Sequence, residues 1–280
     1  MTARSPTLAG IDFTSRPTRR KPITVALGTL VHGVVTLRQM HAHASFESFA
    51  AWLHEPGPWI GGFDFPFGLP RELVESLGWP REWLPLMHHY TGFTREEIRT
   101  TFAAFCAARP VGGKFAHRAC DGPARSSPSM KWVNPPVAYM LHAGVPLLLD
   151  AGVHVPGHHA GDANRVALEA YPGLLAREAI GRRSYKSDEA VRQTPERLLA
   201  RKDVVETLVQ GGTRLGLRLR ASHAQREALV DDACGDRLDA VLCLMQAAWA
   251  STQPGYGVPP GVDAVEGWII SAPWPRAIDG

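Results

Sequence analysis

Two acidic residues of this sequence stand where a carboxylate is costly unless it has a partner. Asp12 ends the apolar run LAGID (residues 8–12), and Asp64 lies within the apolar stretch GGFDFP (residues 61–66). An ionised carboxylate in an apolar strand is unfavourable unless it is paired or binds a cation. Either acid alone could cap a turn or accept backbone hydrogen bonds. Two such acids on strands expected to be neighbours favour a shared divalent cation.

A second pair of acids opens an apolar segment near the C-terminus. Asp236 and Asp239 are spaced i, i+3 in DRLDAVLCLM (residues 236–245), so on a helix they share one face and could point at a common ion. Acids in a first helical turn also stabilise the positive end of the helix dipole. That alternative explains Asp236 better than Asp239, which lies inside the run expected to pack on a sheet.

A fourth acid and a lysine complete the candidate site. Glu169 lies in the strand-like run VALEAYP (residues 166–172), where it could bind metal, position a base or pair with a nearby arginine. Lys186 could offset phosphate charge or lie at the surface with its stem on apolar neighbours. We therefore predict metal ligands at Asp12, Asp64 and Asp239. The predicted catalytic set is Asp12, Asp64, Glu169, Lys186, Asp236 and Asp239.

The donor types indicate which metal to expect. Carboxylate oxygens without paired Cys or His ligands favour Mg²⁺ or Mn²⁺ over zinc. Two such ions, about 4 Å apart, activate a water and stabilise the leaving oxygen in phosphodiester hydrolysis.

The elements that must position these residues follow from the apolar pattern. Three strands in a meander, an amphipathic helix and a buried strand come first, in the order β-β-β-α-β. Their expected ranges are 8–14, 23–30, 33–40, 46–54 and 59–65. An insertion rich in Pro, Gly, His and Trp follows at about 70–160, with helices at 94–108 and 135–143. After the insertion we expect a strand at 166–170 and a helix at 173–180. Two longer helices at 194–210 and 222–250 and a last strand at 265–270 follow. The second long helix is expected to break near Cys234 and Gly235.

Composition excludes several other classes of protein. A chain of 280 residues with 45% hydrophobic and 20% charged residues is typical of a globular protein, here one domain with an insertion. No apolar run reaches the roughly 18 residues that a membrane span needs, and no signal peptide is recognisable. Four cysteines without CxxC spacing favour reduced thiols and a cytoplasmic location. A net charge of +3 does not by itself imply nucleic acid, although basic residues cluster at 16–21, 114–131 and 177–186.

The motifs together resemble the domain of unknown function 429 (DUF429) family, described as predicted nucleases with a ribonuclease-H-like fold. The matching pieces are GID (10–12), FDFPFG (63–68), LEAYP (168–172), YK (185–186), DRLDA (236–240) and EGWI (266–269). They span almost the whole chain, and their order is more specific than any single piece. A more distant resemblance is to the Holliday-junction resolvases, in which a C-terminal helix supplies a D/HxxD pair; Asp236 and Asp239 would occupy those places.

The resemblance implies an α/β fold with a ribonuclease-H-like mixed sheet in the order 3-2-1-4-5, flanked by helices, with the insertion after strand 4. It also implies that the segment MKWVNPPV (residues 130–137) lines the mouth of the site. With the basic loop 114–131, this makes Lys114, Arg118, Lys131 and Asn134 the expected substrate-binding residues.

We predict a divalent-metal-dependent nuclease or phosphodiesterase acting on nucleic acid or another phosphodiester. One alternative is an actin-like or sugar-kinase-like phosphotransferase. The absence of paired glycine-rich phosphate loops after the first strand, where Asp12 is followed by Phe-Thr-Ser-Arg, disfavours it. The other alternative to a nuclease is a non-catalytic binding protein that retains an acidic pocket. The sequence leaves the oligomeric state open.

Overall fold

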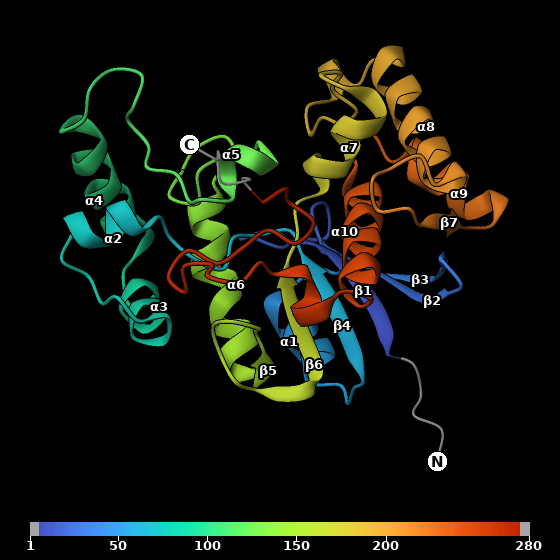
Figure 1. Ribbon diagram of the computed structural model, residues 1–280. Coiled ribbons are helices and arrows are strands. Elements are labelled where there is room, and N and C mark those ends of the chain that lie inside the picture. Colours follow the sequence, from blue (N-terminus) through green and yellow to red (C-terminus); the bar gives the residue numbers. More distant parts are fainter. Residues whose placement is uncertain (1–5, 275–280) are drawn as a thin grey trace, which may run out of the picture.

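The computed structural model describes residues 6–274 and shows an α/β fold built on one mixed sheet (Figure 1). Seven strands lie in the order β5-β6-β4-β1-β2-β3-β7. Their bounds are β1 Thr7–Asp12, β2 Ile23–Val31, β3 Val34–His43, β4 Trp59–Phe63, β5 Val153–His154, β6 Asp162–Glu169 and β7 Arg218–Arg220. Strand β1 is antiparallel to β2 and parallel to β4, so the chain passes through the β1-β2-β3 meander and then returns to the other side of β1.

Helices cover both faces of this sheet. Their bounds are α1 Phe46–Leu53, α2 Arg71–Ser76, α3 Trp83–Thr91, α4 Arg95–Ala107, α5 Asp121–Ala124, α6 Val137–Asp150, α7 Pro172–Ile180, α8 Pro195–Gln210, α9 His223–Asp231 and α10 Asp236–Ala250, with short 3-10 helices at Ala190–Arg192 and Pro254–Gly257. Successive residues of a strand point to opposite faces. Ala9 and Ile11 of β1 therefore join the core that contains α1, α3 and α6, whereas Leu8 joins the core that contains α7, α8 and α10.

Helix α10 crosses the central strands at unusually short range (Figure 1). A Cβ atom on Gly10 of β1 would lie 2.0 Å from the carbonyl oxygen of Ala240, and one on Gly62 of β4 would lie 2.7 Å from that of Cys243. Only glycine lets two backbones approach this closely. These two glycines therefore determine how near the start of α10 lies to the strand ends.

The segment between β4 and β6 contains helices α2 to α6 and strand β5. This is the region where the sequence predicts an insertion. Trp79, Phe102 and His142 pack around Tyr90, whose hydroxyl donates to the carbonyl oxygen of Ala138 in α6 at 2.9 Å. Figure 1 shows α2, α3 and α4 to one side of the sheet, with α6 between them and the strands.

The sheet differs from the expected one in its number of strands. The α/β class, the mixed sheet and the flanking helices are confirmed. The expected five-strand order 3-2-1-4-5 differs from the observed order of seven strands, in which the short strands β5 and β7 form the two edges. Strands of two and three residues are too short to show an alternating pattern. The predicted break in the 222–250 helix is confirmed, because Gly235 adopts a φ of +79° between α9 and α10.

The expected last strand at 265–270 is wrong. These residues form turns and irregular backbone, in which Gly267 has a φ of +72°; the residue that follows the segment, Ser271, has a φ of +63°, and both values lie outside the extended region. The segment still follows the sheet, since the amide of Ile270 donates to the carbonyl oxygen of Glu169 at 2.9 Å. Its apolar character reflects burial without strand pairing. All four cysteines are free, as their spacing predicts.

Candidate metal centre and cleft

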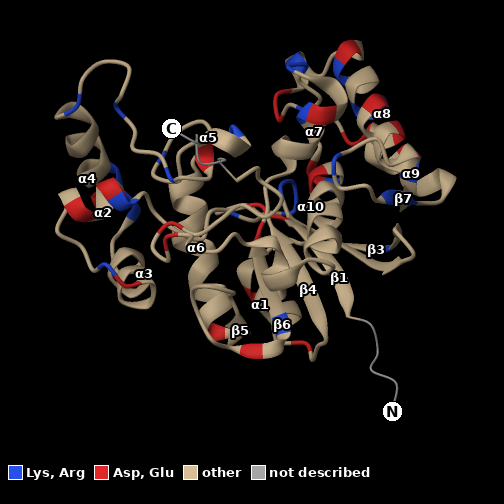
Figure 2. Cartoon of the chain, in the orientation of Figure 1, with Lys and Arg blue, Asp and Glu red and all other residues tan. Residues whose placement is uncertain are grey.

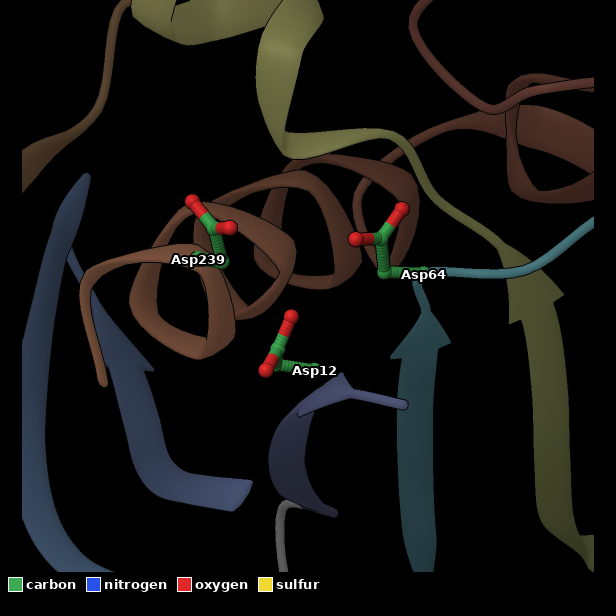
Figure 3. A group of neighbouring side chains, drawn as sticks. All are labelled: Asp12, Asp64 and Asp239. Atoms are coloured by element: carbon green, nitrogen blue, oxygen red, sulfur yellow. The ribbon is translucent and has the colours of Figure 1, made fainter. Parts of the chain in front are cut away.

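Three carboxylates from three separate elements point toward one another at the carboxyl end of the central strands (Figure 3). Asp12 ends β1, Asp64 directly follows β4, and Asp239 lies in the first turn of α10. One oxygen of each carboxylate lies within 4.8 Å of the others. Asp12 and Asp239 are buried, and Asp64 is partly exposed. We call these three residues the acidic triad.

The register of two parallel strands explains why Asp12 and Asp64 meet. Gly10 of β1 lies opposite Gly62 of β4, and the amide of Asp64 donates to the carbonyl oxygen of Ile11 at 2.9 Å. Asp12 and Asp64 each follow their glycine by two residues. Because strand side chains alternate, both carboxylates lie on the same face as the glycines, which is the face that α10 covers.

The segment after α7 holds Asp239 in place from the other side. The Tyr185 hydroxyl donates to one oxygen of Asp239, and the Lys186 Nζ donates to the other. The Arg201 guanidinium donates to the carbonyl oxygen of Tyr185 at 2.7 Å, and the amide of Ser187 donates to that of Ala233 at 3.1 Å. Tyr185 is a site residue that the sequence does not single out, except as part of the YK motif of the resemblance.

Burial and repulsion between neighbouring carboxylates disfavour ionisation of Asp12 and Asp64. Burial raises the pKa of Asp12 well above its usual value, and the neighbouring Asp239 raises it further. Burial likewise raises the pKa of Asp64 to about 7, although Lys186 partly opposes that shift. Burial of Lys186 opposes its positive charge, but Asp239 keeps the pKa of its amine well above the usual value. If all three acids ionised, Lys186, which contacts Asp239, would neutralise only one of the three charges.

A hard divalent cation fits this donor set. Buried carboxylates that share a site repel one another unless positive charge neutralises them. Oxygen ligands of this kind suit Mg²⁺, Mn²⁺ or Ca²⁺, and no Cys or His joins the group among residues 6–274. The three carboxylates could therefore hold a metal ion.

Asp236 is not part of this group. Its carboxylate accepts a hydrogen bond from the Lys21 Nζ at 2.6 Å, and the same Nζ contacts Asp188 at 2.8 Å. The i, i+3 spacing thus places Asp236 and Asp239 on one turn of α10, but each carboxylate has a different lysine partner. Lys21 ties the loop after β1 to the start of α10.

Glu169 lies in a separate buried network. It pairs in register with Phe63 of β4, one residue before Asp64, so its side chain starts from the opposite face of the sheet. The Arg118 guanidinium donates to both carboxylate oxygens of Glu169, at 2.7 and 2.6 Å, and also binds Asp121 at 3.0 Å. Of the roles considered for Glu169, pairing with an arginine is the one the structure displays.

A cleft of about 620 Å³ opens beside the triad. Asp12, Asp64 and Lys186 line it, together with residues of the loop after α7 and of the insertion. Basic and acidic positions occur side by side at this end of the sheet (Figure 2). The volume lies within the range of roughly 300–1,000 Å³ that is usual for ligand sites.

The predicted substrate-binding residues have different places. Arg118 lines the cleft, but it is 3% exposed and its donors are occupied by the network described above. Lys114, Lys131 and Asn134 do not line the cleft. The Lys131 Nζ instead donates to the carbonyl oxygen of Asn134 at 2.6 Å. Pro135, Pro136 and Val137, at the end of the segment 130–137 expected at the mouth, do line the cleft, together with Met140.

No family model, no curated protein and no solved structure matches this chain. Among residues 6–274, no helix has both the length and the apolar character required to cross a membrane.

Proposed function

We propose that this protein is a divalent-metal-dependent hydrolase of phosphodiester bonds, a nuclease-type enzyme on a ribonuclease-H-like fold. One observation carries the proposal: Asp12, Asp64 and Asp239 converge within 4.8 Å at the edge of a 620 Å³ cleft. A buried cluster of like charges is costly for folding. Such a cluster beside a cleft is therefore a good candidate for a functional site.

The triad would hold Mg²⁺ or Mn²⁺ through Asp12, Asp64 and Asp239. When bound, such a cation supplies Lewis-acid activation of the phosphoryl group and of the attacking water. The chain itself would orient the ligands. Tyr185 and Lys186 keep the Asp239 carboxylate directed toward the other two acids, because each occupies one of its oxygens.

Lys186 is the residue of this chain best placed to contact the phosphate. Its side chain is 42% exposed, although its Nζ lies against the fully buried Asp239 carboxylate. An ammonium group in that position can donate to a phosphoryl oxygen and offset the charge that develops on it. Lys21 lines the same cleft and adds a second positive charge.

Metal binding is the first test. Isothermal titration with Mg²⁺ and with Mn²⁺ should show binding to the wild type and its loss in Asp12→Asn, Asp64→Asn and Asp239→Asn. Asp150→Asn is the matched control, since its side chain is 79% exposed and far from the triad in sequence. Equal binding by all four variants would refute the assignment of the ligands.

Hydrolysis is the second test. The wild type should release nitrophenol from bis(p-nitrophenyl) phosphate only with a divalent cation, and the triad variants should not. Metal binding without hydrolysis of any phosphodiester would instead favour the non-catalytic binding protein. Metal-dependent ATP consumption in the presence of a sugar would favour the phosphotransferase.

A further inference from the structure

The two walls of the cleft differ in chemical character. One wall comes from the loop after α7 and carries Arg182, Arg183 and Lys186. The other comes from the insertion and carries Pro135, Pro136, Val137 and Met140, which are exposed or half-buried. The triad lies at the end of the strands between these two segments. A ligand in the cleft therefore meets positive charge on one side and apolar surface on the other.

Arg182 is the arginine of the charged wall that is available to a ligand. It is exposed and has no hydrogen-bond or ion-pair partner within residues 6–274. Its neighbour Arg183 is paired with Asp203 at 2.7 Å. Arg177, which also lines the cleft, donates to the carbonyl oxygen of Ala124 and to the Tyr171 hydroxyl. Arg182 thus remains for a phosphate, beside Lys186, whose Nζ also contacts Asp239.

The apolar wall is held firmly against the sheet. Ala138 at the start of α6 accepts a hydrogen bond from Tyr90 and donates one to the carbonyl oxygen of Lys131, both at 2.9 Å. Arg118 then joins the insertion to Glu169 of β6 through a buried ion pair. These contacts connect the apolar wall to the rest of the insertion, and Arg118 connects the insertion to β6.

From this asymmetry we infer that the substrate is an unpaired nucleotide strand rather than a duplex; the inference rests on the proposed phosphodiesterase function. The phosphate would contact Arg182 and Lys186, and the base would pack on Pro136 and Met140. Basic grooves with apolar or aromatic surfaces for unstacked bases are typical of single-strand binding. A duplex keeps its bases stacked inside a rod whose major groove alone is about 12 Å wide, so it cannot present one base to the apolar wall.

Fluorescence anisotropy with labelled oligonucleotides tests this inference without relying on cleavage. The Asp64→Asn variant is titrated with one short sequence as a single strand of DNA, as the RNA equivalent and as a duplex. We expect at least one single strand to bind about tenfold more tightly than the duplex. Equal or tighter binding of the duplex would overturn the inference.

Two variants, each made in the Asp64→Asn background, test whether each wall of the cleft contacts the single strand. Arg182→Ala should weaken single-strand binding and lower the slope of log K against log salt by about 0.7, the value for one phosphate contact. Met140→Glu should weaken it about fivefold or more, because base packing on that wall is lost. Arg99→Ala is the control, since Arg99 is 61% exposed and does not line the cleft. Unchanged binding by both wall variants would contradict the inference.

Competition distinguishes a polymer from a free dinucleotide. Both carry a phosphate beside an unpaired base, but a dinucleotide that competes as strongly as the oligonucleotide would show that a small diester is the ligand. The experiments also distinguish failure of the proposed function from failure of the single-strand inference. Metal-dependent hydrolysis of bis(p-nitrophenyl) phosphate without single-strand binding would refute only this inference. Single-strand binding without hydrolysis of any diester would refute the proposed function and leave the binding preference intact.

Discussion

Gly10 of β1 and Gly62 of β4 lie opposite each other in register, and both face the backbone of α10. This relationship places Asp12 and Asp64, two residues further along each strand, beside each other under the start of the helix. A shift of one residue in the pairing would send one of the two carboxylates to the other face of the sheet. The glycine pair therefore determines both the packing of α10 and the geometry of the acidic triad.

Gly10→Ala should lower stability and weaken metal binding together. The new methyl group would lie 2.0 Å from the carbonyl oxygen of Ala240, so α10 must move, at a cost of about 1–3 kcal/mol or more. Chemical denaturation and titration with Mg²⁺ measure the two effects. Gly122→Ala is the control, because its Cβ would have no neighbour within 4 Å. A Gly10→Ala protein that binds metal like the wild type would show that the helix position is unimportant for the triad.

Asp64→Asn should abolish metal-dependent cleavage without lowering stability. Loss of a direct ligand should reduce the rate at least about 100-fold, since even residues that merely orient ligands account for 10- to 100-fold. In the absence of a divalent cation, the melting temperature should equal or exceed that of the wild type, because one of three repelling carboxylates is gone. Cleavage at the wild-type rate would remove Asp64 from the site.

The contribution of Asp64 to the stability of the metal-free protein should fall as pH rises from about 4 to about 7. Burial raises the pKa of Asp64 to about 7, whereas the unfolded chain titrates near 4. In that interval the unfolded state binds fewer protons than the folded state, so the free energy of unfolding decreases with pH. Melting temperatures of the wild type and of Asp64→Asn in a chelator measure this contribution as a difference, which removes the opposing effect of other groups such as partly buried His158, whose pKa is lowered to about 4. The wild type should lose stability relative to the variant as pH rises, and less so when Mg²⁺ or Mn²⁺ is present. A wild type that gains stability relative to the variant would contradict the prediction.

Arg118→Met should be strongly destabilising. It leaves Glu169 and Asp121 buried without their common partner, and breaking a buried ion pair in this way costs about 3–5 kcal/mol. Arg192→Ala provides the comparison, since its pair with Glu189 is exposed and such pairs contribute about 0–1 kcal/mol. Urea denaturation measures both. A loss for Arg118→Met as small as that for Arg192→Ala would show that the network does not hold the insertion in place.

Glu169→Gln separates a structural role from metal binding. It should lower stability, because Arg118 loses charge-assisted hydrogen bonds, and it should leave the affinity for Mg²⁺ close to that of the wild type. A loss of affinity as large as that in Asp64→Asn would instead make Glu169 a fourth ligand.

Much of the fold could be predicted because its signals are local. The meander, the first helix, the fourth strand and the break before Asp236 all follow from apolar spacing, glycine and capping residues close in sequence. Strands β5 and β7 could not be predicted, since two or three residues are too few to show an alternating apolar pattern. They are strands because the neighbouring strands pair with them. The segment 265–270 is apolar because it is buried, and the positive φ of Gly267 interrupts the extended pairing that its composition favours.

The acid types and their places at the ends of apolar runs are determined by the sequence itself, because an unpartnered carboxylate in such a run is unfavourable in any fold. Which acids meet was decided only by the tertiary structure. Strand register sets the face to which each side chain points, so Asp64 joins Asp12 whereas Glu169, one register position away, turns to Arg118. Register depends on contacts between residues far apart in the chain, and these exist only once the sheet and α10 have packed together.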